Sequence, residues 1–266
     1  MPDCYRGDMD KPAPPVRDVV HPMRRNFPPA GMKRFWLALF VAGTAQAVAD
    51  PVAGSAEELY RSGKRAVLRG DHVAATRLLE QAVAVAPREP DYQHWLGNSY
   101  AWVAATASLG DKPAMGRKCL AAYLRAIALD PDNLPARFSL MNFYRRVPRV
   151  LGGGLARAGE QAEEIRRRDP LQGAYARAVL QGDEKKYAEA FTTLAGVLRQ
   201  NPAYYAANLT LGRLALESGQ RLDEGATALR RCLALAPSEN DESHEAVTRC
   251  LSQLTAPQPA AVAARD

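Results

Sequence analysis

The chain contains 266 residues, of which 47% are hydrophobic and 24% are charged, with a formal net charge of +6. This composition supports a buried core and excludes a chain that is disordered throughout. The 48 alanines and the low aromatic content of 7% favour helices and argue against an all-β fold. A polytopic membrane protein is also excluded, because no run of about 20 apolar residues is present.

The first 31 residues differ in composition from the rest of the chain. Residues 1–31 contain seven prolines and no helical or strand periodicity, so we expect a disordered extension. A complete export signal begins at Met32, so the alternative is that Met1 is a misassigned start. Arg24 and Arg25 resemble a twin-arginine export signal, but two prolines follow where such signals usually continue differently.

Residues 32–49 have the features of a secretory signal peptide. A basic start is followed by a short apolar run and by small residues that end in an A-x-A site. We predict cleavage after Ala49, with Ala47 as the second choice, and a periplasmic or secreted mature chain. The alternative is an uncleaved membrane anchor, but the apolar stretch of about 14 residues is short for a bilayer span. No stable membrane span is expected after cleavage.

Removing this leader changes the charge of the chain. The remainder holds 28 basic and 25 acidic residues, a net charge near +3. Nucleic-acid binding requires a concentrated basic surface. We therefore expect no nucleic-acid partner.

The remaining chain is repetitive. Proline recurs at intervals of 32 to 44 residues, and small residues flanking a larger one return twelve, eight and five residues before each proline. These sets are Ala75, Leu79, Ala82; Cys119, Tyr123, Ala126; Ala158, Ala162, Ile165; Ala190, Leu194, Val197; and Gly225, Leu229, Cys232. Spacings of four and three place side chains on one helix face. Each set therefore predicts a helix whose small residues let a neighbouring helix approach closely.

A second helix precedes each of these, marked by pairs such as Leu96-Gly97 and Leu211-Gly212. The spacing L-G-x2-Y, then A-x3-F, then A and P resembles the 34-residue tetratricopeptide repeat from Ser55 to about Asn240. In detail the chain is similar to alanine-rich exported bacterial proteins of that family. The resemblance implies an all-α fold, a right-handed α-solenoid of about five TPR-like helical hairpins with a C-terminal capping helix.

This phasing predicts the order of the repeats. They span about 56–89, 90–133, 134–172, 173–204 and 205–239, followed by a capping helix at 243–254 and a flexible tail at 255–266. The second repeat has about ten extra residues within Val103–Lys118, and the third has five around Val147–Gly154. We expect both insertions to form long loops.

The sequence contains no recognisable metal-binding, nucleophile or nucleotide-binding motif. His72, His94 and His244 lie in different repeats, so we expect no metal site. No G-x-S-x-G motif occurs, and the glycines at 152–154 are not followed by the Lys-Ser/Thr of a Walker loop. The chain is therefore expected to be non-enzymatic and to need no cofactor.

Three cysteines follow the leader. Cys119 and Cys232 occupy positions where the repeat places a small buried residue. Cys232 and Cys250 lie eighteen residues apart, on helices that should run antiparallel. An oxidising compartment could join them in a disulfide, and the alternative is that both serve only in packing.

The first helix of each tetratricopeptide repeat lines the concave surface of the stack. Positions five and nine of the repeats, with their neighbours on the same wall, give the candidate partner-binding residues of this groove. They are Tyr60, Lys64, His94, Asn98, Trp102, Phe138, Asn142, Arg145, Arg146, Arg177 and Arg213. Aromatic, amide and guanidinium groups together suit a peptide that carries carboxylates.

The resemblance adds a carboxylate clamp of lysine and asparagine, which related chaperone adaptors have in this location. Asn98 and Asn142 match its amides, but His94 stands where a lysine is expected. The alternative roles are inter-helix packing for Tyr60 and Phe138 and a solvated face for the arginines.

Two functions are consistent with these observations. The first is an exported scaffold or adaptor that binds a protein or peptide partner of the cell envelope through its concave groove, without catalysis. The second is a small-ligand or solute-transporter-associated binding protein, with a pocket formed by the loops of repeats two and three.

Overall fold

The structure is a computed structural model that describes residues 53–238 and 241–256. The expected N-terminal extension, the signal peptide and most of the tail lie outside the described residues. The described part consists of α-helices and one 3-10 turn, contains no strand, and falls within one compact unit. The helices are α1 (Ala53–Leu68), α2 (His72–Val85), α3 (Pro90–Thr106), α4 (Lys112–Leu129), α5 (Leu134–Arg146), α6 (Leu155–Arg168), α7 (Pro170–Asp183), α8 (Tyr187–Gln200), α9 (Tyr205–Ser218), α10 (Leu222–Ala234) and α11 (His244–Thr255), and the 3-10 turn is η1 (Arg149–Leu151).

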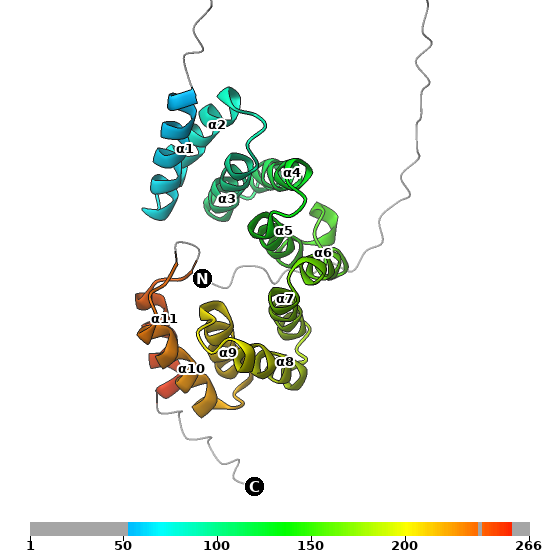
Figure 1. The fold of residues 1–266 in the computed structure, drawn as a ribbon, viewed down its shortest axis with the longest axis vertical. Helices are drawn as coiled ribbons and strands as arrows, with labels where there is room; N and C mark the ends of the chain where they lie inside the picture. The colour runs from blue at the N-terminus through cyan, green and yellow to red at the C-terminus, as the bar shows by residue number, and fades with distance from the viewer. Residues whose placement is uncertain (1–52, 239–240, 257–266) are drawn as a thin grey trace, which may run out of the picture. The chain divides into compact units, whose positions relative to one another are not determined.

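Consecutive helices pair into hairpins that stack in chain order (Figure 1). The first helices of the hairpins are α1, α3, α5, α7 and α9, and each contacts the first helix of the next hairpin. The second helices, α2, α4, α6, α8 and α10, each contact the helix that follows in the chain, and α11 packs on α9 and α10. The predicted all-α solenoid is therefore confirmed.

Side-chain caps mark where several helices begin. Asp71, Asn133, Asp169 and Ser243 precede α2, α5, α7 and α11, and the side chain of each accepts a hydrogen bond from a backbone N–H in the first helical turn. Such caps satisfy N–H groups that have no partner inside the helix. Asp169 also ends α6, so α7 begins at the very next residue, Pro170.

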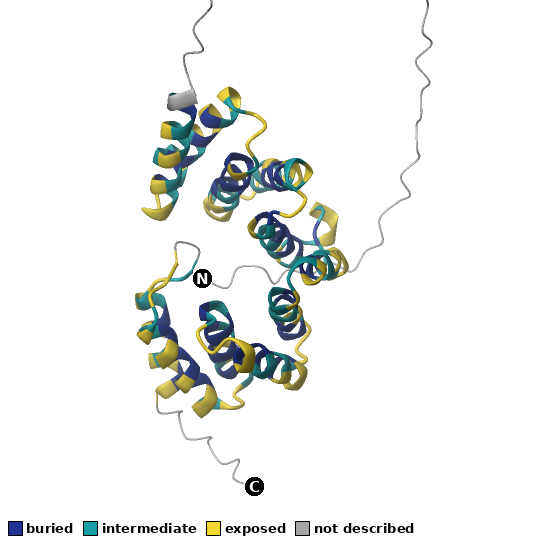
Figure 2. Ribbon diagram, in the orientation of Figure 1, coloured by how far each residue is buried: buried dark blue, intermediate teal, exposed yellow. Residues whose placement is uncertain are grey.

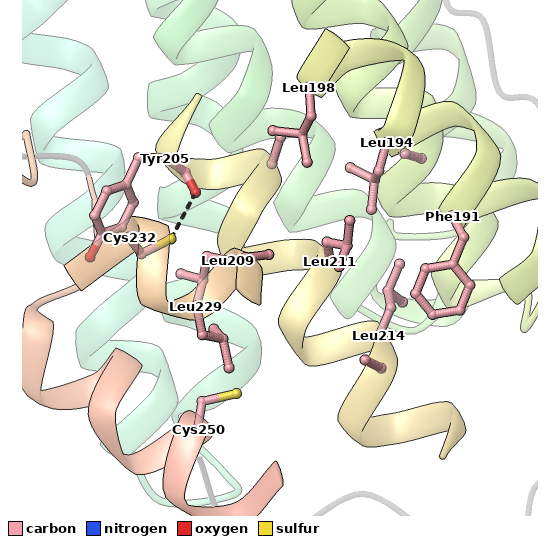
Figure 3. Close-up of a cluster of buried hydrophobic side chains, with 14 of the residues drawn as sticks. Phe191, Leu194, Leu198, Tyr205, Leu209, Leu211, Leu214, Leu229, Cys232 and Cys250 are labelled. Carbon is pink, nitrogen blue, oxygen red and sulfur yellow. Dashed lines mark hydrogen bonds between the residues drawn. The ribbon is translucent and has the colours of Figure 1, made fainter. Parts of the chain in front are cut away.

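The small-large-small sets predicted from the sequence form the core between the helices. All fifteen of these residues are buried, and buried faces line the contacts between helices in Figure 2. Gly212 shows how close this packing is, because a Cβ added there would lie 2.4 Å from the Leu229 side chain. Figure 3 shows Leu194 and Leu198 of α8 near the leucines of α9, with Leu229 of α10 on the other side.

The two insertions do not both form long loops. In the second hairpin the extra residues lengthen the helices, since α3 runs to Thr106 and α4 starts at Lys112, which leaves a short turn. In the third hairpin residues 147–154 do form a loop, which contains η1. Gly152 and Gly154 adopt positive φ angles of 90° and 125°, which only glycine adopts at little cost.

Candidate functional site

The predicted groove residues of α3 pack against α5 and α4. The His94 Nε2 lies 3.0 Å from the Ser139 Oγ and 3.3 Å from the Asn98 amide nitrogen. The Asn98 Oδ1 accepts hydrogen bonds from the Tyr123 hydroxyl, at 2.9 Å, and from Ser139, at 3.2 Å. His94 is only 4% exposed. These contacts remove His94 from the surface that a partner could touch and join successive first helices instead.

Three other predicted residues connect the first two hairpins. Tyr60 of α1 stacks on Tyr92 of α3, with ring centroids 4.5 Å apart. The Lys64 Nζ lies 5.0 Å from the centre of the Trp95 ring, in a cation–π arrangement. Trp102, although 42% exposed, stacks on the His72 ring at the start of α2. For Tyr60, the predicted alternative of inter-helix packing is observed.

The arginines expected in the groove form a cluster with two acids, which we call the arginine cluster: Arg145, Arg146 and Arg213 with Asp183 and Glu242. The Arg145 Nε and one terminal nitrogen donate to the Asp183 carboxylate at 2.5 Å and 2.8 Å. Arg213 forms an ion pair with Glu242. The cluster thus draws on α5, α7, α9 and the segment before α11.

Arg146 is the surplus cation of this cluster. Its side chain is exposed and makes no hydrogen bond or ion pair within residues 53–238 and 241–256. Although the side chain reaches solvent, the surrounding residues partly desolvate the Arg146 guanidinium and so lower its pKa. The neighbouring Arg145 and Arg213 lower this pKa further, whereas Asp183 and Glu242 oppose the shift. An arginine stays protonated despite such surroundings, so the cluster holds three positive charges against two negative ones.

An aromatic row lies beside the arginine cluster. Phe138 of α5 contacts Tyr175 of α7, with ring centroids 5.9 Å apart, and Tyr175 contacts Tyr204 at 5.2 Å. The Tyr175 hydroxyl also lies 3.3 Å from the Thr210 Oγ1. Burial raises the pKa of Tyr175, while two arginines of the cluster lower it, which places this ring within electrostatic reach of the cluster.

Of the remaining two predicted groove residues, Asn142 lies beside the arginine cluster and Arg177 lies outside it. Asn142 lies near the cluster, with its Oδ1 at 3.5 Å from an Arg145 nitrogen. Arg177 is exposed on α7 and acts electrostatically on Lys186 in the following turn, with no ion pair among the described residues. Arg177 was assigned to the groove because the predicted repeat 173–204 placed a turn after Pro170. In the structure α7 already begins at that proline, so Arg177 occupies a later position of the helix.

Sequence reasoning missed the partners of the arginines. Tyr175 was overlooked because it is the sixth residue of α7, whereas the repeat places its groove residues at the fifth and ninth positions. Asp183 ends α7 and Glu242 precedes α11, so neither falls on a repeat position. No sequence signal assigned them to an arginine.

The two cysteines for which a disulfide was considered are free thiols in the structure. Cys232 and Cys250 are both buried and unbonded. The Cys232 thiol lies 3.5 Å from the Tyr205 carbonyl oxygen, and Leu229 lies between the two cysteines in the view of Figure 3. The structure therefore contains no disulfide between Cys232 and Cys250.

Other sites for small molecules are poorly developed. A hollow of about 340 Å³ lies between α3 and α4, and its lining residues come from these helices. No residue of the turns at 107–111 or 147–154 lines it. Among the residues that the structure describes, no group of three histidine, cysteine or acidic residues could hold a metal ion, and no helix could span a membrane.

Comparisons with known proteins match this geometry. Residues 183–250 match the family model described as tetratricopeptide repeat. The chain is 28% identical over 185 residues to "Cellulose synthase operon protein C" of Xanthomonas axonopodis pv. citri (strain 306), a match that covers 66% of this chain. It spans only 11% of that relative's length. The fold is similar to the crystal structure of TTC0263, a thermophilic TPR protein of Thermus thermophilus, with a TM-score of 0.58 and 20% identity over 75% of this chain and 99% of that one.

Proposed function

Because the chain is a tetratricopeptide-repeat protein, we propose that it is a non-catalytic scaffold or adaptor that binds a polypeptide partner on its first helices. Repeat stacks of this kind offer an extended surface formed by adjacent units. Here that surface contains the arginine cluster and the aromatic row. Side chains of α5 and α7 contribute to both, together with Arg213 of α9, Tyr204 just before α9 and Glu242 before α11. Their positions therefore depend on the stacking of three hairpins.

The surplus charge of Arg146 is the observation that carries this proposal. Arg145 and Arg213 already have acidic partners, whereas the exposed Arg146 guanidinium has none among the described residues. Guanidinium groups bind carboxylates through paired, charge-assisted hydrogen bonds. A carboxylate placed at Arg146 would balance the charge of the cluster and relieve the repulsion among the three arginines.

The aromatic row defines the second requirement for the partner. Phe138, Tyr175 and Tyr204 are only partly buried, so their rings can still contact an apolar side chain. Tyrosine and arginine are also the residue types that contribute most at protein interfaces. We therefore propose a peptide segment that presents a carboxylate next to an aromatic or aliphatic side chain.

The location of this binding is proposed from the sequence. The basic start, apolar run and A-x-A site of residues 32–49 support export, so the partner would belong to the cell envelope. Sequencing of the mature N-terminus checks this part, and a start other than Asp50 or Val48 would contradict the proposed cleavage.

Peptide selection tests the binding site. Peptides displayed on phage are selected on the full chain, and the strongest are synthesised and measured by fluorescence anisotropy. We expect peptides that contain an acidic group and a bulky apolar side chain. Arg146→Glu should weaken their binding by about ten-fold or more, since it replaces an attractive charge with a repulsive one.

Arg177→Glu is the matched control, because it makes the same charge change at an exposed arginine outside the arginine cluster. Binding to this variant should stay within about two-fold of the unchanged chain, which is the scale expected for an exposed charge that solvent and salt screen from the bound peptide. Equal weakening by both variants, or selected peptides without acidic groups, would refute the assignment of this site.

A further inference from the structure

Exposed apolar side chains gather at one part of the fold. Every large hydrophobic residue that is exposed in the described part of the chain lies at or before Leu155. Most of them flank the turns that join the two helices of the first, second and third hairpins. We call this set the turn edge: Leu68, Val73, Trp102, Leu109, Val150, Leu151 and Leu155. Leu109 and Val150 are each 75% exposed.

Contacts tie these three turns together. The ring of Trp102, near the end of α3, stacks on His72, which directly follows the first turn. Gly152 of the third turn lies against Leu120 of α4, so that a Cβ added to it would be 3.7 Å from the Leu120 side chain. Since α1, α3 and α5 also contact one another in order and each leads into one of these turns, the three turns lie on the same side of the stack. Figure 2 shows η1 of the third turn as exposed.

Positive charge is concentrated in the second and third of these hairpins. Residues 92–159 contain nine lysines and arginines but only three acidic residues, a net charge of +6. Residues 160–256 contain twelve basic and fourteen acidic residues. Lys112, Arg117 and Arg149 lie in or next to the second and third turns, and none has an ion pair among the described residues.

The last two hairpins provide an internal comparison. Their turns occupy the same place in the repeat but contain Lys185, Lys186 and Arg221 with Gln220. No large hydrophobic residue of the described part is exposed there. Lys186 and Arg221 are paired with nearby glutamates. Lys185 has no ion pair among the described residues, so what distinguishes the first half of the stack is the exposed apolar side chains at its turns.

We propose that the turn edge docks on the surface of an anionic phospholipid membrane. Segments that bind membrane interfaces combine apolar side chains, which enter the boundary of the acyl chains, with basic residues, which bind anionic head groups. A nucleic acid would use the cations but has no need of exposed Leu109 and Val150. The docked protein would leave the arginine cluster, at α5, α7 and α9, available for its partner.

Vesicle flotation tests this docking with the full chain. The probe is a vesicle of equal parts phosphatidylglycerol and phosphatidylcholine, compared with a vesicle of phosphatidylcholine alone. The chain should float with the anionic vesicles and bind the neutral ones more weakly. The double variant Leu109→Ser with Val150→Ser should reduce partitioning by about ten-fold or more, because two apolar tips no longer enter the interface.

A matched double variant, Ala188→Ser with Gln220→Ser, places the same residue at the fourth and fifth turns and should bind like the unchanged chain. Circular dichroism checks that both double variants remain helical, and both serine pairs are exposed in the fold. Failure of the unchanged chain to float would overturn the proposal. So would full binding by Leu109→Ser with Val150→Ser, which would show attraction by charge alone.

Discussion

Arg145 on α5 donates two hydrogen bonds to Asp183 at the end of α7, at 2.5 Å and 2.8 Å to the two carboxylate oxygens. The pair fastens two successive first helices together, and its side chains are mostly shielded, with 16% and 27% exposed. It also pairs Asp183, one of the two acids that act electrostatically on Arg146, with Arg145. One interaction therefore serves the stability of the stack and leaves the neighbouring guanidinium for a partner.

Replacing Asp183 with asparagine should destabilise the fold. The change leaves Arg145 as a poorly solvated cation without its acidic partner, which should lower the free energy of unfolding by about 1–2 kcal/mol. Urea denaturation measures this loss. The control is Glu245→Gln, which removes the exposed Arg249–Glu245 pair of α11 and should cost less than about 0.5 kcal/mol. Equal effects would show that the Arg145–Asp183 pair contributes no more than a surface pair.

Gly212→Ala should destabilise the last hairpins. An added Cβ would lie 2.4 Å from the Leu229 side chain, which is fully buried, so α9 and α10 would have to separate. We expect a loss of about 2 kcal/mol in the free energy of unfolding, measured by thermal or urea denaturation.

Gly196→Ala is the matched control in α8. The nearest atom to its added Cβ is the end of the flexible Arg199 side chain, at 3.8 Å. Because alanine has the higher helix propensity, this variant should gain about 0.5–1 kcal/mol. A stability gain from both glycine replacements would contradict the close packing of α9 on α10.

The repeat spacing was enough to predict the core. Residues such as Leu194 and Val197 recur at fixed offsets because every hairpin packs against its neighbours through the same helix positions. Each repeat therefore needs residues of similar size at those positions. All of these positions are buried, and the predicted solenoid is confirmed.

The site was less predictable, because its chemistry depends on contacts between repeats. The sequence located Arg145 and Arg146 at the end of α5 but could not pair Arg145 with Asp183, 38 residues away. It placed His94 on the surface because a helix position says nothing of what the next helix covers. The single-residue junction at Asp169 starts α7 three residues earlier than the predicted repeat, so Arg177 is the eighth residue of the helix and not the fifth.

Protonation of His94 should weaken the fold in acid. Burial lowers the pKa of His94 to about 4, with Asp91 opposing this and Lys64 adding to it. In the unfolded chain the pKa is about 6.5. Below that pH the unfolded chain binds a proton that folded His94 does not accept, so stability falls from about pH 6.5 towards pH 4.

The size of this effect can be isolated with a variant. The free energy of unfolding should fall by about 3 kcal/mol across that range from His94 alone. In His94→Gln the loss of unfolding free energy between about pH 6.5 and pH 4 should be smaller by roughly this amount. In the control His244→Gln the loss should equal that of the unchanged chain. Urea denaturation at several pH values measures it, and parallel curves for the unchanged chain and His94→Gln would refute the assignment.

Cys232 and Cys250 should remain free and slow to react. Burial raises the pKa of the Cys232 thiol to about 11 and also raises that of Cys250, and the thiolate is the form that reacts. Alkylation of the folded chain at pH 8 should therefore be at least about ten-fold slower at these residues than at an exposed cysteine introduced by Ala188→Cys. After unfolding without a reductant, peptide mass spectrometry should find both alkylated. A peptide pair joined through Cys232 and Cys250 would instead establish the bridge.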